Sequence, residues 1–194
     1  SSYDQAIELK PNYAVAHNGR ATTLQELGKL AEALVSYDQA IELKSDYAEA
    51  YSNRGNVLQE MEQLAEAVAS YDRAIQIKPG YAEAHNDLGL AFFQMDQLDT
   101  AISCFERALT IQPDYFIADV NLGLVLGQTD QLDAAFSCYE RALAINPDCH
   151  VARFNLSLID VFNIDCFSLS IISKFNSIND ILIFSFKNDL FFLF

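Results

Sequence analysis

Histidine and cysteine are the residues of this sequence that most readily bind a metal or form a covalent bond. His17 and His85 stand 68 residues apart, with Tyr51 midway between them, and Cys104 and Cys138 are separated by 34 residues. This regular spacing indicates equivalent places in a repeat. Neighbouring helices lie about 8–10 Å apart, so histidines two repeats apart cannot bind the same metal ion. The expected separation of the two cysteine Cα atoms likewise exceeds the roughly 7 Å limit for a disulfide. We interpret the cysteines as small core residues and the histidines as packing residues of aromatic size.

Paired carboxylates and glycine-rich loops are the next candidates for chemistry. Asp96 with Asp99, and Asp130 with Asp133, could do acid–base work, but each pair begins an expected helix, where capping and dipole stabilisation explain it. Only seven glycines are present, and they form no phosphate-binding loop, dinucleotide fingerprint or nucleophile elbow. We therefore predict that the chain is not an enzyme and holds neither cofactor nor metal ion.

A column of polar residues is the one feature that points to a ligand. Asparagine is a mediocre helix former, so its recurrence within helices calls either for a structural hydrogen bond or for a ligand, and both remain open. An amide carries a donor and an acceptor, so a ladder of amides could clamp the backbone of an extended peptide. The column, with its polar neighbours, gives the candidate peptide-binding set: Asn53, Asn56, Asn86, Asp87, Asn121 and Asn155.

These side chains need elements that hold them in register, and the sequence repeats with a period of 34 residues. Columns at this spacing include Tyr13, Tyr47, Tyr81 and Tyr115; Ala33, Ala67, Ala101 and Ala135; and Tyr37, Tyr71, Phe105 and Tyr139. Apolar residues at three- and four-residue spacing make a stripe that a helix must bury. We predict helices at about 1–10, 14–27, 30–43, 48–61, 64–77, 82–95, 98–111, 116–128, 131–145 and 149–161.

Small and turn-forming residues recur at the same period. Gly55, Gly89 and Gly123 allow close approach of the two helices of each pair. Prolines stop the preceding helix, and a column of short residues is predicted to cap the next one with its side chains: Asn12, Asp46, Gly80, Asp114 and Asp148.

The combined pattern resembles the tetratricopeptide repeat, and His85, Leu88, Gly89, Phe92, Ala101, Phe105 and Pro113 carry the motif in one copy. The resemblance implies an all-α fold, a right-handed α-solenoid of antiparallel helix pairs whose first helices line a concave groove. The departures are Arg20 and Arg54 in a leucine column, Ala21 in the glycine column and Ser45 in the proline column.

The repeats are most similar to the superhelix of protein O-linked N-acetylglucosamine transferases and of bacterial glycosyltransferase fusions. In those relatives an asparagine ladder holds the substrate polypeptide, and Asn53, Asn121 and Asn155 match it, whereas Asp87 departs from it and Gly19 has no side chain. The groove offers no lysines or arginines of the kind that grip acidic chaperone C-termini. We expect a protein-binding scaffold. The alternative is the substrate-recruiting part of a larger glycosyltransferase whose catalytic domain is absent here.

The period assigns residues 1–160 to the solenoid: a half repeat at 1–12, repeats at 13–46, 47–80, 81–114 and 115–148, and a first helix at 149–160. Residues 161–194 are different, because eight of the 14 phenylalanines are found there. This tail could be a cap, a membrane contact or a truncated or frame-shifted continuation, and charges interrupt any span. The opening reads as the middle of a helix, so we expect a fragment.

Composition sets the remaining limits. The formal net charge of −15 repels nucleic acid and anionic lipid surfaces. Four cysteines are too few for a disulfide scaffold, which favours a cytoplasmic setting. We therefore expect a protein or peptide partner and no nucleic acid; membrane contact is disfavoured, and nothing indicates an oligomer.

Overall fold

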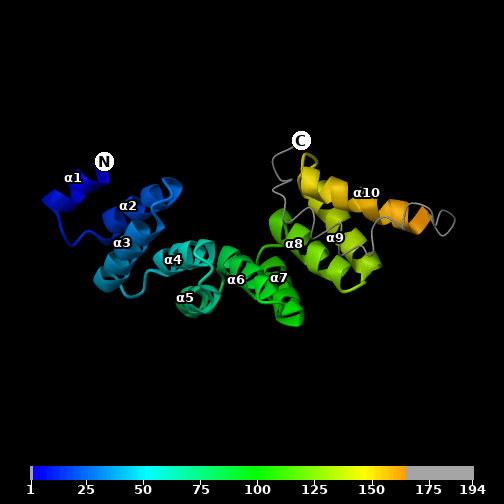
Figure 1. Cartoon of the computed structure of the whole chain (residues 1–194), viewed down its shortest axis with the longest axis horizontal. Helices are drawn as coiled ribbons and strands as arrows, with labels where there is room; N and C mark the ends of the chain where they lie inside the picture. Colours follow the sequence, from blue (N-terminus) through cyan, green and yellow to red (C-terminus); the bar gives the residue numbers. More distant parts are fainter. Residues whose placement is uncertain (1, 165–194) are drawn as a thin grey trace. The chain divides into compact units, whose positions relative to one another are not determined.

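The computed structural model describes residues 2–164, with side chains described up to Ile159, and every element in that range is an α-helix (Figure 1). Two compact units follow one another, divided between Gln97 and Leu98. The first contains α1 (Ser2–Leu9), α2 (Ala14–Glu26), α3 (Leu30–Leu43), α4 (Ala48–Glu60), α5 (Leu64–Ile77) and α6 (Ala82–Gln94). The second contains α7 (Leu98–Ile111), α8 (Phe116–Gln128), α9 (Leu132–Ile145) and α10 (His150–Ile164).

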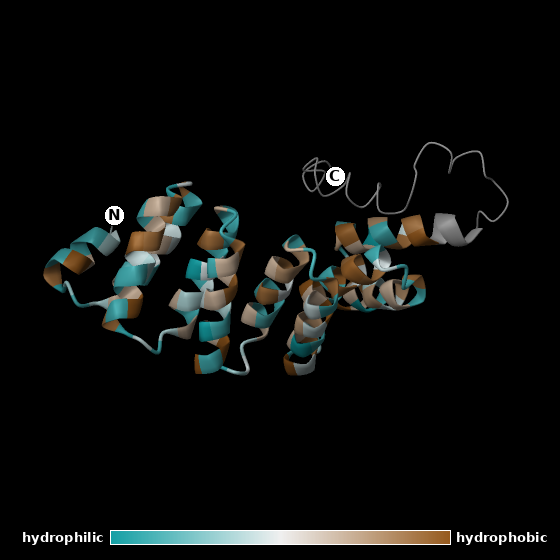
Figure 2. Cartoon of the chain, turned by 60° about the horizontal axis from the view of Figure 1, so that its bottom comes forward, coloured by the Kyte–Doolittle hydropathy of each residue, from teal (hydrophilic) through white to brown (hydrophobic). Residues whose placement is uncertain are grey.

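Helices that are adjacent in the sequence pack against each other within each unit. In the first unit α2 contacts α3 and α4 contacts α5, and the pairs are joined through α3 with α4 and α5 with α6. In the second unit α8 packs between α7 and α9, and α9 contacts α10. Brown, apolar ribbon segments recur along the helices of both units in Figure 2. The fold is an all-α solenoid.

The predicted columns form the cores. Tyr37 and Tyr71 are fully buried in the first unit, as is Phe105 in the second, and Tyr139 is 1% exposed. Alanines at four- and three-residue spacing flank each ring: Ala33 and Ala40 are fully buried beside Tyr37, and the other pairs follow the same rule. The stripe therefore packs one aromatic ring between small residues, which lets the helix backbones approach closely.

Predicted close approach is visible at two of the glycines. A Cβ atom at Gly55 would lie 2.5 Å from Cε1 of Tyr71, and one at Gly123 would lie 2.7 Å from Cε1 of Tyr139. Both distances are shorter than carbon atoms tolerate without a shift of the ring. The absence of a side chain at these positions therefore makes room for the aromatic ring of the following helix.

The prediction that the short polar column caps the first helices was wrong. The N-cap residues of α2, α4, α6 and α8 are the tyrosines that follow that column, with φ between −83° and −95°, and none has a side-chain cap hydrogen bond. The amide of Tyr13 donates to the carbonyl of Lys10 at 3.2 Å, and Tyr47 and Tyr81 repeat this contact. Pro11 and Asn12 are thus the central residues of a β-turn, a role that suits both residue types.

Capping by Asp96 and Asp130 was also wrong. Both residues have φ of 59°, and Glu62 and Gly28 hold the equivalent position at 60° and 71°. They form the left-handed link between the two helices of a pair, a conformation that asparagine and aspartate tolerate better than most residues. Asp99 and Asp133 do lie in the first turns of α7 and α9, where a negative charge complements the helix dipole.

The helix ends agree with the predicted ranges within three residues. The largest difference is at α10, which continues to Ile164 although its repeat pattern was expected to stop at 161. No proline or glycine follows Val151 in this stretch, so nothing in the local sequence ends the helix. The remainder of the predicted tail lies outside the described residues. No helix among residues 2–164 is long and apolar enough to cross a membrane.

Candidate functional site

The first helix of each pair presents one side that its partner helix does not cover. Residues at spacing i, i+4, i+7 and i+11 share this side of a helix. In the first unit α4 contacts both α2 and α6, so the three first helices lie next to one another. We call this surface the first-helix face of unit 1, and its members are Val15, Gly19, Thr22 and Glu26 on α2, Glu49, Asn53, Asn56 and Glu60 on α4, and Glu83, Asp87, Leu90 and Gln94 on α6.

Asn53 lies on this face and is half-buried. Its amide nitrogen donates to Oδ1 of Asn18 on α2, at 3.4 Å. Such a distance marks a weak hydrogen bond, and Asn18 itself is 7% exposed. One pair of neighbouring first helices is therefore linked by amide side chains, while the oxygen of Asn53 is left for another donor.

Asn56 has a structural partner that the sequence analysis missed. The hydroxyl of Tyr71 donates to Oδ1 of Asn56 at 2.7 Å and lies 2.9 Å from Oε1 of Gln59. Tyr37 makes the equivalent contacts with Thr22, at 3.2 Å, and Gln25, at 3.3 Å. The sequence does contain a signal for these contacts. The columns of Thr22 with Asn56 and of Gln25 with Gln59 are polar in the two repeats whose tyrosine hydroxyls they contact.

Asn86 and Asp87 are neighbours on α6. Asn86 is 2% exposed, and its amide donates to Oδ1 of Asp87 at 3.1 Å. Asp87 is half-buried on the first-helix face, and burial raises the pKa of its carboxyl to about 6, with a smaller contribution from the nearby charge of Glu83; the hydrogen bond from Asn86 opposes both. No cationic side chain pairs with this carboxylate among the described residues, so its charge is poorly compensated.

Gly19 opens the same column without a side chain, and the structure shows what takes the space. A Cβ atom at Gly19 would lie 2.5 Å from Cε1 and Cζ of Tyr3 on α1. The ring of Tyr3 thus covers the position at which an asparagine of the ladder would begin. The candidate ladder of unit 1 consists of Asn53 with Asp87, supported by the amide of Asn18.

Asn121 and Asn155 belong to the second unit, on α8 and α10. Asn121 is half-buried, whereas Asn155 is 4% exposed. Asn155 therefore differs from Asn53 and Asn121 in being buried, on a helix that packs against α9. The same face of this unit is apolar elsewhere: Ile117 is 43% exposed, and Leu124 and Leu158 are half-buried.

The two arginines that depart from the repeat pattern connect second helices. Arg54 donates from Nη1 to Oγ of Ser70 and from Nε to Oδ1 of Asp38, each at 2.7 Å. Arg20 likewise reaches Ser36, at 3.1 Å, and Asp4, at 3.9 Å. Each arginine is therefore engaged away from the first-helix face, and no other lysine or arginine occurs on α2, α4 or α6.

The histidine column has a structural role. Nε2 of His17 lies 2.9 Å from the carbonyl oxygen of Pro11, and Nε2 of His85 lies 3.3 Å from that of Pro79. Arg153 donates to the carbonyl of Pro147 at the equivalent place. A side-chain donor at this position satisfies a turn carbonyl that faces no backbone amide, which the packing interpretation had missed. Among the described residues, no three histidine, cysteine or acidic side chains are placed to hold a metal ion.

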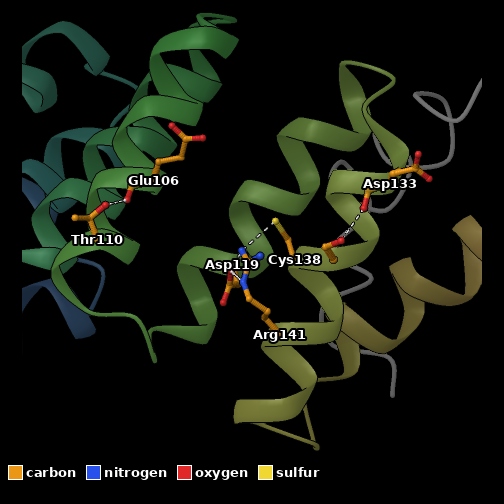
Figure 3. Close-up of polar contacts among 7 residues, drawn as sticks. Glu106, Thr110, Asp119, Asp133, Cys138 and Arg141 are labelled. Carbon is orange, nitrogen blue, oxygen red and sulfur yellow. Dashed lines mark hydrogen bonds and ion pairs between the residues drawn. The ribbon is translucent and has the colours of Figure 1, made fainter.

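Asp119 occupies the same column in the second unit and cannot donate. Instead its Oδ1 accepts from Nε of Arg141 at 3.0 Å and also from Nη2, and Nη2 lies 3.4 Å from Sγ of Cys138 (Figure 3). Asp119 is fully buried, and its Oδ2 has no partner. Burial raises the pKa of this carboxyl, and Arg141 acts in the opposite direction. Burial likewise raises the pKa of the Cys138 thiol, which favours its protonated form, and the charge of Arg141 acts in the opposite direction.

Comparison with protein families decides what these paired helices are. Four family sequence models match in overlapping segments, three described as tetratricopeptide repeat, at residues 2–35, 46–114 and 86–148, and one described as TPR repeat, at residues 23–62. The chain belongs to the tetratricopeptide-repeat family. No curated protein sequence matches it.

Solved structures with the same fold include two tetratricopeptide-repeat proteins at about one-quarter identity. The crystal structure of MamA is 26% identical with a TM-score of 0.68, and the match covers 75% of this chain and 85% of MamA. YrrB, described as a TPR protein with an unusual peptide-binding site, is 25% identical with a TM-score of 0.68 and covers 84% of both chains. MamA from Desulfovibrio magneticus RS-1 is 20% identical at a TM-score of 0.67, covers 76% of this chain and 84% of its own, and shows the fold alone.

Proposed function

We propose that this tetratricopeptide-repeat chain is a non-catalytic scaffold that binds extended segments of a partner protein along the first helices of its repeats, on the first-helix face of unit 1 and on α8 and α10 of unit 2. The observation that carries the proposal is the side-by-side packing of α2, α4 and α6, which places equivalent polar residues of successive repeats in rows. An extended peptide has a repeating backbone, so rows of amides can bond to it while its side chains vary. YrrB, a structural neighbour, supports the proposal through its stated peptide-binding site.

The test pairs peptide affinity with thermal stability. Asn53, Asn121 and Asn155 are each replaced by alanine, alone and together, and affinity is measured for peptides selected on the wild-type chain. Each lost hydrogen bond is worth about 0.5–1.5 kcal/mol, so the triple variant should bind roughly ten- to a thousandfold more weakly if the effects add. Substitution of Gln39, Gln76 and Thr110 by alanine serves as control, because these residues lie on second helices.

The three single variants separate the ligand role from the structural role. Asn53→Ala should leave the melting temperature nearly unchanged, because the hydrogen bond of Asn53 to Asn18 is long, at 3.4 Å. Asn155→Ala should lower it, because that side chain is buried. Undiminished affinity of a folded triple variant would remove the amide rows from the proposal.

The narrower possibility is that the scaffold recruits substrates for a glycosyltransferase. It depends on the column of Asn53, Asn121 and Asn155, and it requires a catalytic domain joined to or bound by this chain. Capture of peptides that an O-linked N-acetylglucosamine transferase modifies, with capture lost in the triple variant, would support it. Equal capture of unmodified control peptides would contradict it.

A further inference from the structure

The first-helix face of unit 1 carries a one-sided charge. Five carboxylates lie on it: Glu26, Glu49, Glu60, Glu83 and Asp87. The arginines of the same helices, Arg20 and Arg54, turn toward Asp4, Asp38 and the serines of the second helices. The lysines that precede α2, α4 and α6 each place Nζ over the ring of the tyrosine three residues later: Lys10, Lys44 and Lys78. The face is therefore acidic over three consecutive first helices.

The carboxylates of α4 and α6 lie on neighbouring helices, because these two first helices contact each other. In agreement with this, the charges of Glu49, Glu83 and Asp87 add to burial in raising the pKa of the Tyr81 hydroxyl. Asp87 and Glu60 act on the pKa of Tyr71 in the same direction, again after burial. A cationic group placed between the two helices would therefore interact with carboxylates of both.

Asp87 on this face, and Asn18 beside it, have polar groups available to a ligand. Asp87 is half-buried and accepts a hydrogen bond from Asn86, so the carboxylate is partly desolvated without a counterion among the described residues. Asn18 is 7% exposed, and its Oδ1 accepts from Asn53 while its amide nitrogen has no acceptor among the described residues. The amide nitrogen of Asn18 can donate to a carbonyl oxygen of a ligand, and a partly desolvated carboxylate favours an ammonium or guanidinium group.

From this arrangement we propose that the first-helix face of unit 1 selects an extended, cationic peptide segment, with backbone carbonyls bonded to Asn18 and lysine or arginine side chains placed between Glu49, Glu83 and Asp87. This inference rests on the proposed function and names its partner class. Opposite charges across the interface would set specificity and association rate. Acidic segments are repelled by the same carboxylates.

The test uses three fluorescently labelled twelve-residue peptides that differ only in charge. One alternates lysine with threonine, and the others carry glutamine or glutamate in place of lysine. Affinity for the full chain is measured by fluorescence anisotropy at about 0.05 M and 0.3 M NaCl. The lysine peptide should bind at least about tenfold more tightly than the glutamine peptide at low salt, and the ratio should fall as salt screens the contacts.

Variants with matched charge separate this face from the net charge of −15. Glu83→Gln with Asp87→Asn should weaken binding of the lysine peptide roughly tenfold and leave the glutamine peptide unaffected. Glu42→Gln with Glu66→Gln removes the same charge from exposed residues of α3 and α5 and should change little. An equal loss in both double variants would overturn the inference, because the attraction would then come from the whole molecule.

Failure of the inference and failure of the proposed function give different results. Equal affinities for the lysine and glutamine peptides, both weakened by Asn18→Ala in a variant that stays folded, would keep peptide binding and refute charge selection. Binding of none of the three peptides, together with no peptide recovered by selection on the wild-type chain, would refute both.

Discussion

At the scale of single residues, tyrosine hydroxyls determine which side chains of the first helices are available for binding. Tyr71 uses the oxygens of Asn56 and Gln59, so those amides hold the core ring in place before they meet a ligand. Asn53 and Asp87 do not accept a hydrogen bond from the Tyr71 hydroxyl. The residues free to recognise a partner are therefore those one turn away from the tyrosine contacts.

Asp87 gives a pH-dependent prediction. Its pKa of about 6 lies above the ordinary value of 3.8, so between these values the unfolded chain releases a proton that the folded chain retains. Stability contributed by this group is therefore lost as the pH rises from about 4 to 6 and stays lost above. Asp87→Asn should stabilise the chain by about 1–2 kcal/mol at pH 7.5 and by less at pH 5, measured by urea unfolding at both values. A gain of equal size at both pH values would show that charge is not the cause.

The role of a residue could be predicted only where the residue types of its own column were sufficient to indicate it. The tyrosine and alanine columns identified the core, because a periodic apolar stripe must be buried. The role of Arg54 could not be found that way, since its partners Ser70 and Asp38 are 16 residues away in opposite directions along the chain. A comparison between columns would have helped: serine accompanies arginine in the first two repeats, and cysteine accompanies leucine in the next two.

At the scale of the helix pair, glycine and the following aromatic ring act as one packing unit. Gly55→Ala should destabilise the chain by about 1–3 kcal/mol, because its Cβ would lie 2.5 Å from a Tyr71 ring that Asn56 and Gln59 hold in place. The measurement is the midpoint of thermal or urea unfolding.

A control for this prediction is available in the same chain. Gly80 lies in a turn where an added Cβ meets no atom within 4 Å, so Gly80→Ala should leave stability unchanged or raise it slightly by restricting the unfolded chain. Equal destabilisation by both substitutions would mean that contact with the Tyr71 ring does not decide the effect.

The ends of the helices show why element type was easier to predict than capping. The 34-residue period predicted the position of each helix in the described part of the chain, because the apolar stripe extends over a whole helix. Which residue caps a helix depends on one dihedral angle, and Asn12 and Asp46 are equally suited to a β-turn and to an N-cap. In the structure the short polar residue lies in the turn: the amide of the following tyrosine donates to the carbonyl oxygen of Lys10 or Lys44, whose Nζ lies over the tyrosine ring at 5.3 Å in the first case and 4.7 Å in the second.

At the scale of the whole molecule, charge is the property least balanced by the fold. The sequence has 27 acidic against 12 basic residues. Ion pairs such as those of Arg20 with Asp4 and Arg54 with Asp38 join successive repeats of unit 1. Exposed pairs contribute little each. Folding therefore concentrates a repulsion that the unfolded chain spreads over a larger volume.

The resulting prediction concerns ionic strength. The Debye length falls from about 30 Å at 0.01 M salt to about 8 Å at 0.15 M, which screens repulsion between carboxylates of neighbouring repeats more than contacts such as that of Arg54 with Asp38. The melting temperature should rise by about 2–6 °C over this range, and an uncharged solute of equal osmolality should not reproduce the rise. A fall would mean that the ion pairs outweigh the repulsion. If the acidic first-helix face is its main source, Glu83→Gln with Asp87→Asn should reduce the rise more than Glu42→Gln with Glu66→Gln, since only the first pair lies where carboxylates of adjacent helices converge.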